Sequence, residues 1–262
     1  MRLRIATWNV NSVRLRAEQA ARFIAEQAPD VLAMQEIKCQ EAEFPRQAFI
    51  DAGLPHLAIS GQKGWHGVAI ASRLPIEAVA PLSLCREGHA RCVSAKIAGV
   101  EIHNLYIPAG GDIPDRAENP KFDHKLDFFA RLTAEMAERS PAAPLILAGD
   151  LNVAPGEFDV WNHNYMSKVV SHTPPEVAAM AALQASLGFH DPVRAAYPEP
   201  TKLASWWSYR AADFRLSQRG LRLDHIWLTP ALKDASNARI HDDARAWERP
   251  SDHAPVSVDL EV

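Results

Sequence analysis

One stretch of this sequence predicts both a core strand and a site: Leu145-Ile146-Leu147-Ala148-Gly149-Asp150-Leu151-Asn152. A continuous aliphatic run of this kind is typical of a strand that is buried on both faces. The run breaks at Gly149, and Asp150 and Asn152 then fall on one side of the chain if the strand continues that far. We therefore expect polar side chains at the end of a rigid strand, where functional groups are often placed. A strand that simply ends in a turn is an equally weighted alternative, because Gly, Asp and Asn are common turn residues.

The composition is that of an ordinary soluble globular chain of 262 residues, of which 47% are hydrophobic and 23% are charged. We expect a single domain over residues 1–262, because no linker, low-complexity segment or short repeat interrupts the sequence. No apolar stretch is long enough to cross a bilayer, and residues 1–5 resemble a first strand rather than a signal peptide. The three cysteines, Cys39, Cys85 and Cys92, have no metal-ligand spacing, which favours free thiols in a reducing, cytoplasmic setting.

The net charge of −4 does not by itself indicate a nucleic-acid partner. The same sum is obtained when a strongly negative cluster of metal-binding carboxylates is surrounded by a basic rim. The total charge does not separate these two arrangements, so the question of a polyanionic partner depends on the motifs.

The rest of the chain alternates between helical and strand-like periodicity. Helices are expected over residues 15–28, 47–52, 122–139 and 174–187. Strands are expected over residues 4–11, 31–36, 68–72, 76–80, 91–97, 100–106, 145–152, 221–228 and 256–258. Residues 61–67 form a glycine-rich loop in which Lys63 is placed to meet a phosphate, with a plain hairpin loop as the alternative.

Polar side chains recur at, or beside, the ends of these strands. They are Asn9, Asn11, Glu36, Tyr106, Asp150, Asn152, Asp224, Asp252 and His253. Each alone has a structural explanation, such as a solvated strand end or a buried tyrosine with one hydrogen bond. Together, carboxylates, amides and one histidine are the ligands that Mg²⁺ or Mn²⁺ prefers, and such sites commonly handle phosphate esters. The sequence contains no Gly-x-Ser-x-Gly elbow, P-loop or dinucleotide fingerprint.

With these residues in place, the sequence resembles the exonuclease III branch of the AP endonucleases, within the DNase I-like endonuclease/exonuclease/phosphatase superfamily. The matching pieces are residues 8–11, 32–38, 61–64, 104–108, 149–152, 205–210, 220–224 and 251–255. The Gln-Glu, Gly-Asp-x-Asn and Ser-Asp-His pieces mark the superfamily. The Gly-Gln-Lys-Gly loop, the Trp-rich piece and Gly-Leu-Arg-x-Asp indicate the DNA-repair branch. The resemblance implies an α/β fold, a four-layered sandwich of two packed mixed β-sheets flanked by helices.

The resemblance also implies an activity, a cofactor and a partner. The activity is divalent-metal-dependent hydrolysis of DNA phosphodiesters in base-excision repair, with incision 5′ to abasic sites, 3′–5′ exonuclease action and cleaning of 3′ ends. The implied metal is Mg²⁺, with Mn²⁺ as an alternative. The implied partner of this monomer is double-stranded DNA with abasic sites or damaged 3′ ends, and an abasic nucleotide is cheap to extrude because it lacks stacking and pairing.

Three other interpretations compete with this resemblance. A phosphodiesterase of the same fold that acts on RNA or another phosphate ester is disfavoured by Trp206 and by the Gly-Leu-Arg-x-Asp piece. A non-catalytic DNA-binding module is disfavoured because Glu36, Asp150 and His253 are all present. A purely structural α/β protein leaves the convergence of polar strand ends unexplained.

The resemblance assigns roles to individual residues. The implied metal site comprises Asn9, Asn11, Glu36, Asp150, Asn152, Asp252 and His253, with Glu36 as the main ligand. The residues implied to act on the phosphate and the attacking water are Tyr106, Asp150, Asn152, Asp224 and His253. In this scheme Asp150 deprotonates or positions the water, and His253, oriented by Asp224, stabilises charge on the phosphoryl oxygens. The implied DNA contacts are Lys63, Lys121, Trp206, Arg210 and Arg222, with Trp206 as a wall of the pocket for the base-free sugar.

One position departs from the family pattern. After Tyr106-Ile107-Pro108 the family usually carries Gln or Asn, whereas this chain has Ala109 followed by two glycines. The departure leaves open the balance between endonuclease and 3′-end activities, while the core chemistry is unaffected.

Overall fold

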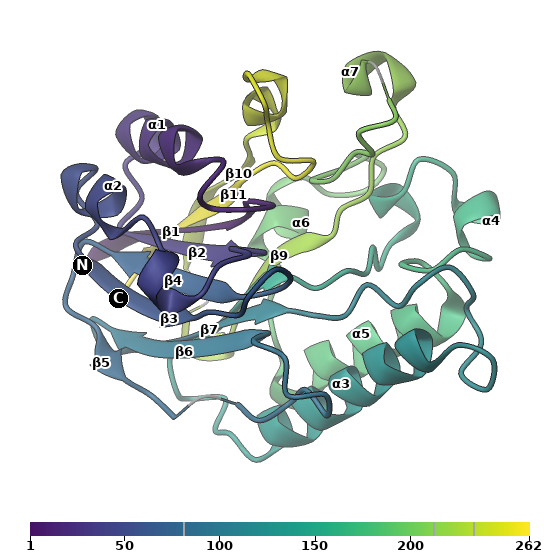
Figure 1. Ribbon diagram of the computed structural model, residues 1–262. Helices are drawn as coiled ribbons and strands as arrows, with labels where there is room; N and C mark the ends of the chain where they lie inside the picture. Colours follow the sequence, from purple (N-terminus) through teal and green to yellow (C-terminus); the bar gives the residue numbers. More distant parts are fainter. Residues whose placement is uncertain (81, 212, 233) are drawn as a thin grey trace.

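Two mixed β-sheets pack face to face in the computed structural model, which describes residues 1–80, 82–211, 213–232 and 234–262 (Figure 1). The first sheet has the order β10-β11-β1-β2-β4-β3 and the second has the order β5-β6-β7-β8-β9. The strands of the first sheet are β1 (Arg2–Asn9), β2 (Val31–Gln35), β3 (His56–Ser60), β4 (Val68–Ser72), β10 (Ala235–Ile240) and β11 (Val256–Glu261). Those of the second sheet are β5 (Glu77–Ala78), β6 (Cys92–Ile97), β7 (Val100–Tyr106), β8 (Leu145–Asp150) and β9 (Asp224–Leu228).

Helices cover the outer face of each sheet (Figure 1). The α-helices are α1 (Ala17–Gln27), α2 (Arg46–Asp51), α3 (Pro120–Ala137), α4 (His163–Met166), α5 (Pro174–Leu187), α6 (Pro192–Ala196) and α7 (Phe214–Ser217). Short 3₁₀ turns occupy Glu41–Glu43, Glu157–Asp159, Pro230–Leu232 and Asp242–Ala246. Helices α1 and α2 pack on the first sheet, and α3 and α5 pack on the second. The predicted four-layered α/β sandwich is confirmed.

The strand β8 is buried on both faces, as its aliphatic run predicted. Ile146 and Ala148 point between the sheets, where they join a core that includes Ile5 and Ile226. Leu145 and Leu147 point the other way, into the layer beneath α3 and α5. Alternate residues of one strand therefore tie together three of the four layers.

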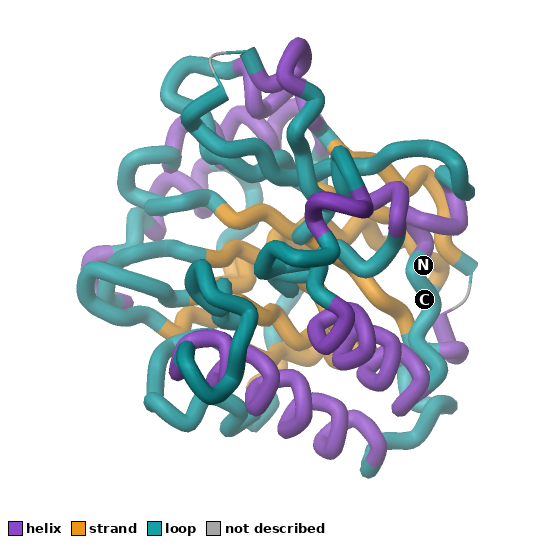
Figure 2. The backbone as a smooth tube through the Cα atoms, turned by 90° about the vertical axis from the view of Figure 1, so that its right-hand side faces the viewer, coloured by secondary structure: helices purple, strands orange, loops and turns teal. Residues whose placement is uncertain are grey.

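Strand directions bring many chain ends to one edge of the sandwich. In the first sheet β1 and β2 run parallel, β3 ends beside the start of β4, and β11 begins opposite the end of β1. In the second sheet β7 and β8 run parallel and end at the paired residues Tyr106 and Asp150, and β9 begins with Asp224 opposite Asp150. Figure 2 looks onto the side of the molecule where the connecting loops gather. Polar residues at these strand ends are therefore neighbours.

Several predicted boundaries differ from the structure for local reasons. The helix predicted from residue 122 begins at Pro120, because the side chain of Asn119 accepts a hydrogen bond from the backbone N–H of Lys121 (3.0 Å) and caps it. The strand predicted over residues 76–80 shortens to β5. The strand predicted over residues 221–228 begins only at Asp224, because Leu221 bridges Val160 and Trp206 instead. Strands β3 and β10 and helices α4, α6 and α7 were not predicted.

Candidate active site

A cavity of about 680 Å³ opens at the edge where the strand ends meet. Its polar lining comes from both sheets and includes Glu36, Tyr106, Asp150, Asn152, Asp252 and His253. All six were predicted site residues. Two further ones, Asn9 and Asp224, are fully buried or nearly so and lie directly behind this lining.

Gly149 allows β8 to present Asp150 at the cavity. Its φ of +143° is strained for an L-residue, and a Cβ atom here would lie 2.0 Å from the carbonyl oxygen of Leu105 on the neighbouring strand. The strand then ends at Asp150, and Asn152 adopts a left-handed φ of +55°. The strand therefore does not continue to Asn152, and the alternative in which it ends in a turn is the one that the structure shows. Asn152 still reaches the cavity, because the turn lets its backbone N–H donate to Oδ1 of Asp150 (3.0 Å).

The same correction applies to the first sheet, where β1 ends at Asn9 and Asn11 has a left-handed φ of +44°. The turn is held because the backbone N–H of Asn11 donates to the side-chain oxygen of Asn9 (3.1 Å). Both polar pairs thus lie close together through a side-chain-to-backbone turn and not through strand alternation.

Asn9 connects carboxylates that belong to different sheets. Its amide nitrogen donates to Oε1 of Glu36 (2.9 Å) and to Oδ2 of Asp150 (3.0 Å). The hydroxyl of Tyr106 donates to the same oxygen of Glu36 (2.8 Å). Burial raises the pKa of Tyr106 well above its usual value, and the charges of Glu36 and Asp150 raise it further, so the phenol stays protonated as a donor.

His253 lies between two buried carboxylates. Its Nδ1 contacts Oδ2 of Asp224 (2.9 Å), and its Nε2 is 3.8 Å from Oδ2 of Asp150. Burial alone lowers the pKa of His253, but the two carboxylates outweigh it and raise that pKa to about 10. Ser205 holds the arrangement by donating its hydroxyl to Oδ2 of Asp224 (2.6 Å), a role that no sequence pattern indicated.

The protonation state bears on the two roles implied for His253. Both ring nitrogens face carboxylate oxygens, Nδ1 that of Asp224 and Nε2 that of Asp150, and an imidazolium donates from both nitrogens, which suits charge stabilisation. Asp150, Asp224 and His253 are close enough to share a cation. We interpret them as an ion triad, because the histidine already supplies the positive charge.

Burial also raises the pKa of Asp150 to about 7, with Asp224 and Glu36 adding to the rise and His253 opposing it. By contrast, the pKa of Glu36 is lowered, because Lys38 and Asn9 outweigh its burial. The environments of the two carboxylates therefore shift their pKa values in opposite directions.

Lys38 connects Glu36 to Asn11 and, through Asn11, to Asp252. Its ammonium contacts Oε2 of Glu36 (2.8 Å) and Oδ1 of Asn11 (2.5 Å). Asn11 in turn donates to Asp252 (3.0 Å), which also accepts from the indole N–H of Trp206 (3.0 Å). Lys38 belongs to a matched sequence piece but was not predicted as a site residue.

The donor set fits a hard divalent cation. Carboxylate oxygens of Glu36, Asp150 and Asp252 and amide groups of Asn11 and Asn152 lie at or beside one cavity. No cysteine sulfur lines it among the described residues. Oxygen-rich sites of this kind suit Mg²⁺ and Mn²⁺ rather than structural zinc.

The backbone at Ala109 is held from beneath by a buried ion pair. Lys125 of α3 and Glu176 of α5 contact each other with both side chains fully buried. The Lys125 ammonium also donates to the carbonyl oxygens of Asn152 (2.7 Å) and Ala109 (3.2 Å). The ion pair thus fixes the backbone of the loop at Ala109, the position where the sequence departs from the family pattern.

Arg222 requires a correction, because it does not lie along the surface. Its side chain is 2% exposed, and its guanidinium makes a bidentate pair with Asp159 (2.7 and 3.0 Å) and a further bond to Asp191 (2.6 Å). These hydrogen bonds hold the guanidinium inside the protein. We therefore assign Arg222 a structural role, as the partner of two carboxylates behind the cavity.

The other predicted DNA contacts are placed as a surface role requires. Trp206 and Arg210 line the cavity, and Lys63 and Lys121 are exposed in the loop at residues 61–67 and at the start of α3. In the described part of the chain, none of these three cations has a carboxylate oxygen within 4.0 Å. Their charges are free to attract an anion.

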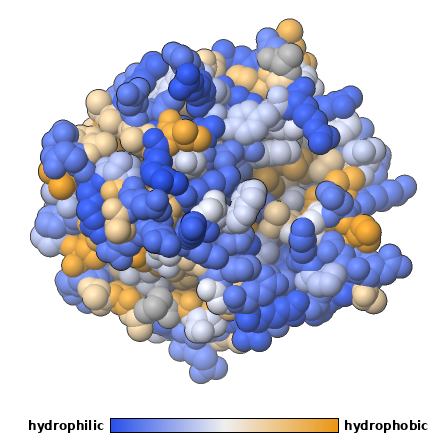
Figure 3. Space-filling view, viewed as in Figure 1, coloured by the Kyte–Doolittle hydropathy of each residue, from blue (hydrophilic) through white to orange (hydrophobic). Residues whose placement is uncertain are grey.

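The surface seen in the orientation of Figure 1 is largely hydrophilic, with small scattered apolar areas (Figure 3). Among the described residues, no helix combines the length and apolar character needed to span a bilayer.

Comparisons with known proteins agree over nearly the whole chain. Residues 6–253 match the model of the Endonuclease/Exonuclease/phosphatase family. The sequence is 30% identical to the exodeoxyribonuclease III of Haemophilus influenzae, over 97% of this chain and 98% of that protein. An AP endonuclease from Archaeoglobus fulgidus superposes with a TM-score of 0.92 and 32% identity, covering 99% of this chain and 100% of that one. A 3′ phosphatase from Neisseria, bound to a product DNA hairpin, superposes with a TM-score of 0.89 and 33% identity at the same coverage.

Proposed function

Because this chain belongs to the Endonuclease/Exonuclease/phosphatase family, we propose that its cavity hydrolyses DNA phosphodiesters 5′ to abasic sites and trims or cleans 3′ ends. The general activity is that of a phosphodiester hydrolase among the DNA-repair nucleases. The substrate, the metal and the individual residue roles given below are the proposal.

One observation carries the proposal: Asn9 joins Glu36 to Asp150 across the two sheets, while Asp224 holds His253 against Asp150. A base, a fixed anion and a cation thus meet in one cavity. Phosphodiester hydrolysis needs these three features, because a nucleophile must be activated while negative charge builds on the phosphoryl oxygens.

The proposed chemistry assigns one task to each group. Asp150, with its pKa raised to about 7, accepts the proton of the attacking water. The imidazolium of His253 donates to a phosphoryl oxygen as that oxygen gains charge. Tyr106, held protonated, offers a second donor on the same side of the cavity.

Mg²⁺ or Mn²⁺ would be held by Glu36 together with Asp252 and Asn11, and would supply Lewis-acid stabilisation of the phosphate and leaving oxygens. Lys38 contacts both Glu36 and Asn11. Lys38 therefore holds the carboxylate of Glu36 and the amide of Asn11 close to each other.

DNA is the proposed polymer, because Arg210, Arg219 and Trp206 line the same cavity as the proposed catalytic groups. An abasic nucleotide enters most readily, since it has no base to unstack or unpair. We further propose a monomer that acts in the cytoplasm. All three cysteines are free thiols, which suits a reducing compartment.

The test is cleavage of a labelled duplex that carries one tetrahydrofuran abasic analogue. It is run with Mg²⁺, with Mn²⁺ and with EDTA, using the wild type, Asp150→Asn and, as a surface control, Asp127→Asn. Asp127 is paired with Arg131 on α3, away from the cavity lining. We expect one metal-dependent cut 5′ to the lesion, lost in Asp150→Asn and kept in Asp127→Asn.

Other outcomes have distinct meanings. Shortening from 3′ ends without the internal cut would leave a 3′-end enzyme, and Ala109→Asn would then be the first variant to examine. A folded, metal-loaded protein that cleaves no DNA would overturn the proposal. RNA and small phosphodiesters would be tested next.

A further inference from the structure

The cavity has an aromatic wall that the proposed chemistry does not use. It comes from the connection between β8 and α5 and from the segment before β9, and its lining includes Trp161, Tyr165, Met166, Leu221 and Leu223. This wall lies in the same cavity as the carboxylates. A base-free sugar offers little surface for so extended an apolar face.

Three side chains of this wall lie side by side, with Trp161 in the middle, and we call them the aromatic platform: Tyr165, Trp161 and Arg219. The rings of Trp161 and Tyr165 have centroids 5.3 Å apart with an interplanar angle of 42°. The guanidinium of Arg219 lies 5.0 Å from the centroid of the Trp161 ring. The platform thus combines π-faces with a cation, the two features that proteins use against unpaired nucleobases.

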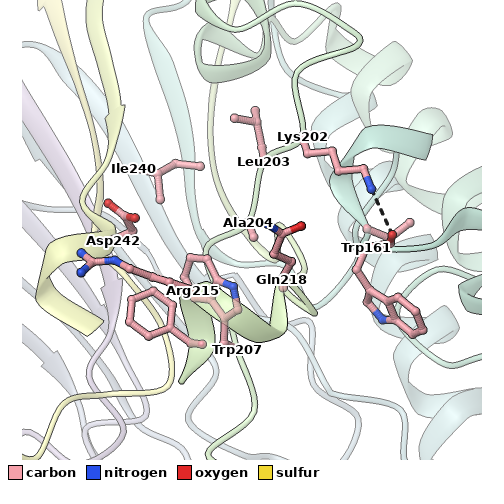
Figure 4. A pocket seen from close by; sticks show the side chains of 12 residues that line it. Trp161, Lys202, Leu203, Ala204, Trp207, Arg215, Gln218, Ile240 and Asp242 are labelled. Atoms are coloured by element: carbon pink, nitrogen blue, oxygen red, sulfur yellow. Dashed lines mark hydrogen bonds between the residues drawn. The ribbon is translucent and has the colours of Figure 1, made fainter. Parts of the chain in front are cut away.

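Local structure fixes the platform before any ligand arrives. The side chain of Asn162 caps α4 by accepting from the backbone N–H of Tyr165 (3.0 Å), which sets the turn that brings residues 161 and 165 together. Lys202 donates to the carbonyl oxygen of Trp161 (3.2 Å), as the dashed line in Figure 4 shows. Trp161 also lines a second groove of about 450 Å³, which Figure 4 shows, so it borders both cavities.

The exposure of Tyr165 and the charge of Arg219 indicate that the aromatic platform can bind a further group. Tyr165 is 59% exposed, although it sits at the mouth of a cavity where an aromatic face gains from being covered. Within the described ranges, the guanidinium of Arg219 has no carboxylate oxygen within 4.0 Å. A flat, uncharged ring beside a phosphate would satisfy both groups at once.

We propose that the aromatic platform stacks on the base of an unpaired 3′-terminal nucleotide, so that the cavity accepts base-bearing nucleotides as well as base-free sugars. The cavity volume of about 680 Å³ lies well within the range of about 300–1,000 Å³ for sites that bury whole small molecules. The inference rests on the proposed nuclease function and specifies the substrate class of the same site.

The test compares two duplexes that differ only at a mismatched 3′ terminus, which carries either 2-aminopurine or tetrahydrofuran. The KM for terminal removal is measured for the wild type, Tyr165→Ala, Tyr165→Phe and Tyr197→Ala. Tyr197 is a matched exposed tyrosine outside the cavity lining. The ratio of the two KM values is the readout, since it cancels general losses of folding or catalysis. Quenching of 2-aminopurine fluorescence in the EDTA-treated complex reports stacking independently of activity.

We expect Tyr165→Ala to shift the KM ratio against the base-bearing end by about tenfold and to reduce the quenching. Tyr165→Phe keeps the ring and should retain both properties, and Tyr197→Ala should match the wild type. An unchanged ratio and unchanged quenching in Tyr165→Ala, with the wild type active on both ends, would overturn this inference alone. Absence of any DNA cleavage by the wild type would instead overturn the proposed function on which it rests.

Discussion

Replacing Arg222 by Met distinguishes two roles of this side chain. One is the structural role that its ion pairs indicate, and the other is the DNA contact that the family resemblance implies. The change removes three hydrogen bonds to carboxylates and leaves Asp159, which is 1% exposed, and Asp191 without their main partner. Removing one member of a buried ion pair costs about 3–5 kcal/mol. Arg194 still contacts Asp159, so we expect the lower end, about 3 kcal/mol.

For a chain of this size, each kcal/mol lowers the melting temperature by about 2–4 °C, so Arg222→Met should melt about 6–12 °C below the wild type. Calorimetry and urea unfolding measure the loss. Restoring neutrality should recover part of it: the double variant Arg222→Met/Asp159→Asn should be less destabilised than the sum of the single variants, because the uncompensated buried charge is gone.

The matched comparison is Arg210→Met. Arg210 lines the candidate active-site cavity, and among the described residues its guanidinium lacks a carboxylate partner. This variant should keep the wild-type melting temperature. Its DNA affinity should fall, with the slope of log affinity against log salt reduced by about 0.9 for one lost phosphate contact. The reverse result, in which Arg222→Met melts normally but loses one unit of salt slope, would refute the inward assignment of Arg222.

Three further outcomes are expected. Glu36→Gln should weaken Mn²⁺ binding by roughly tenfold or more in calorimetric titration without altering the melting temperature greatly, and equal affinity would exclude this carboxylate as a ligand. Gly149→Ala should lower stability by more than about 4 kcal/mol and reduce soluble yield, because its Cβ would lie 2.0 Å from the carbonyl oxygen of Leu105. Burial raises the pKa of Asp159, but its arginine partners outweigh this and hold the pKa well below its usual range. The unfolded chain then binds the proton first, so this stabilisation is present above about pH 3.9 and is lost as the pH falls further. Urea midpoints measured between pH 5 and pH 2 should therefore fall less steeply in Arg222→Met than in the wild type.

Sequence patterns predicted the convergence of the proposed catalytic groups because that convergence follows from strand direction. Glu36, Tyr106 and Asp150 each lie at, or directly after, the carboxyl end of a strand. Parallel pairing of β1 with β2 and of β7 with β8 then brings these ends to one edge. The grouping of those residues needed only local information and one rule of topology.

The residues whose roles the sequence predicted wrongly, or did not predict, depend on contacts between distant segments of the chain. Arg222 lies in a motif that resembles a DNA-binding piece, but its partner Asp159 is 63 residues away in the chain. Lys125 and Glu176 are separated by 51 residues, and nothing in either helix pattern marks them as a buried ion pair. Ser205 belongs to a matched sequence piece, but the piece does not indicate that its hydroxyl donates to Asp224, 19 residues away. Pairing of this kind is fixed by tertiary packing, which a single sequence does not display.

The same pairing explains why the net charge was uninformative. Several carboxylates form ion pairs with arginines away from the cavity. Asp159 and Asp191 pair with the buried Arg222, and Asp259 of β11 pairs with Arg4 of β1. The exposed cations near the cavity, such as Arg210 and Arg219, have no such partners in the described ranges. A sum of −4 therefore coexists with a face able to attract a polyanion. Since these exposed charges are screened by salt, the attraction should govern the rate of encounter with DNA more than the chemistry, which is performed by groups that are buried.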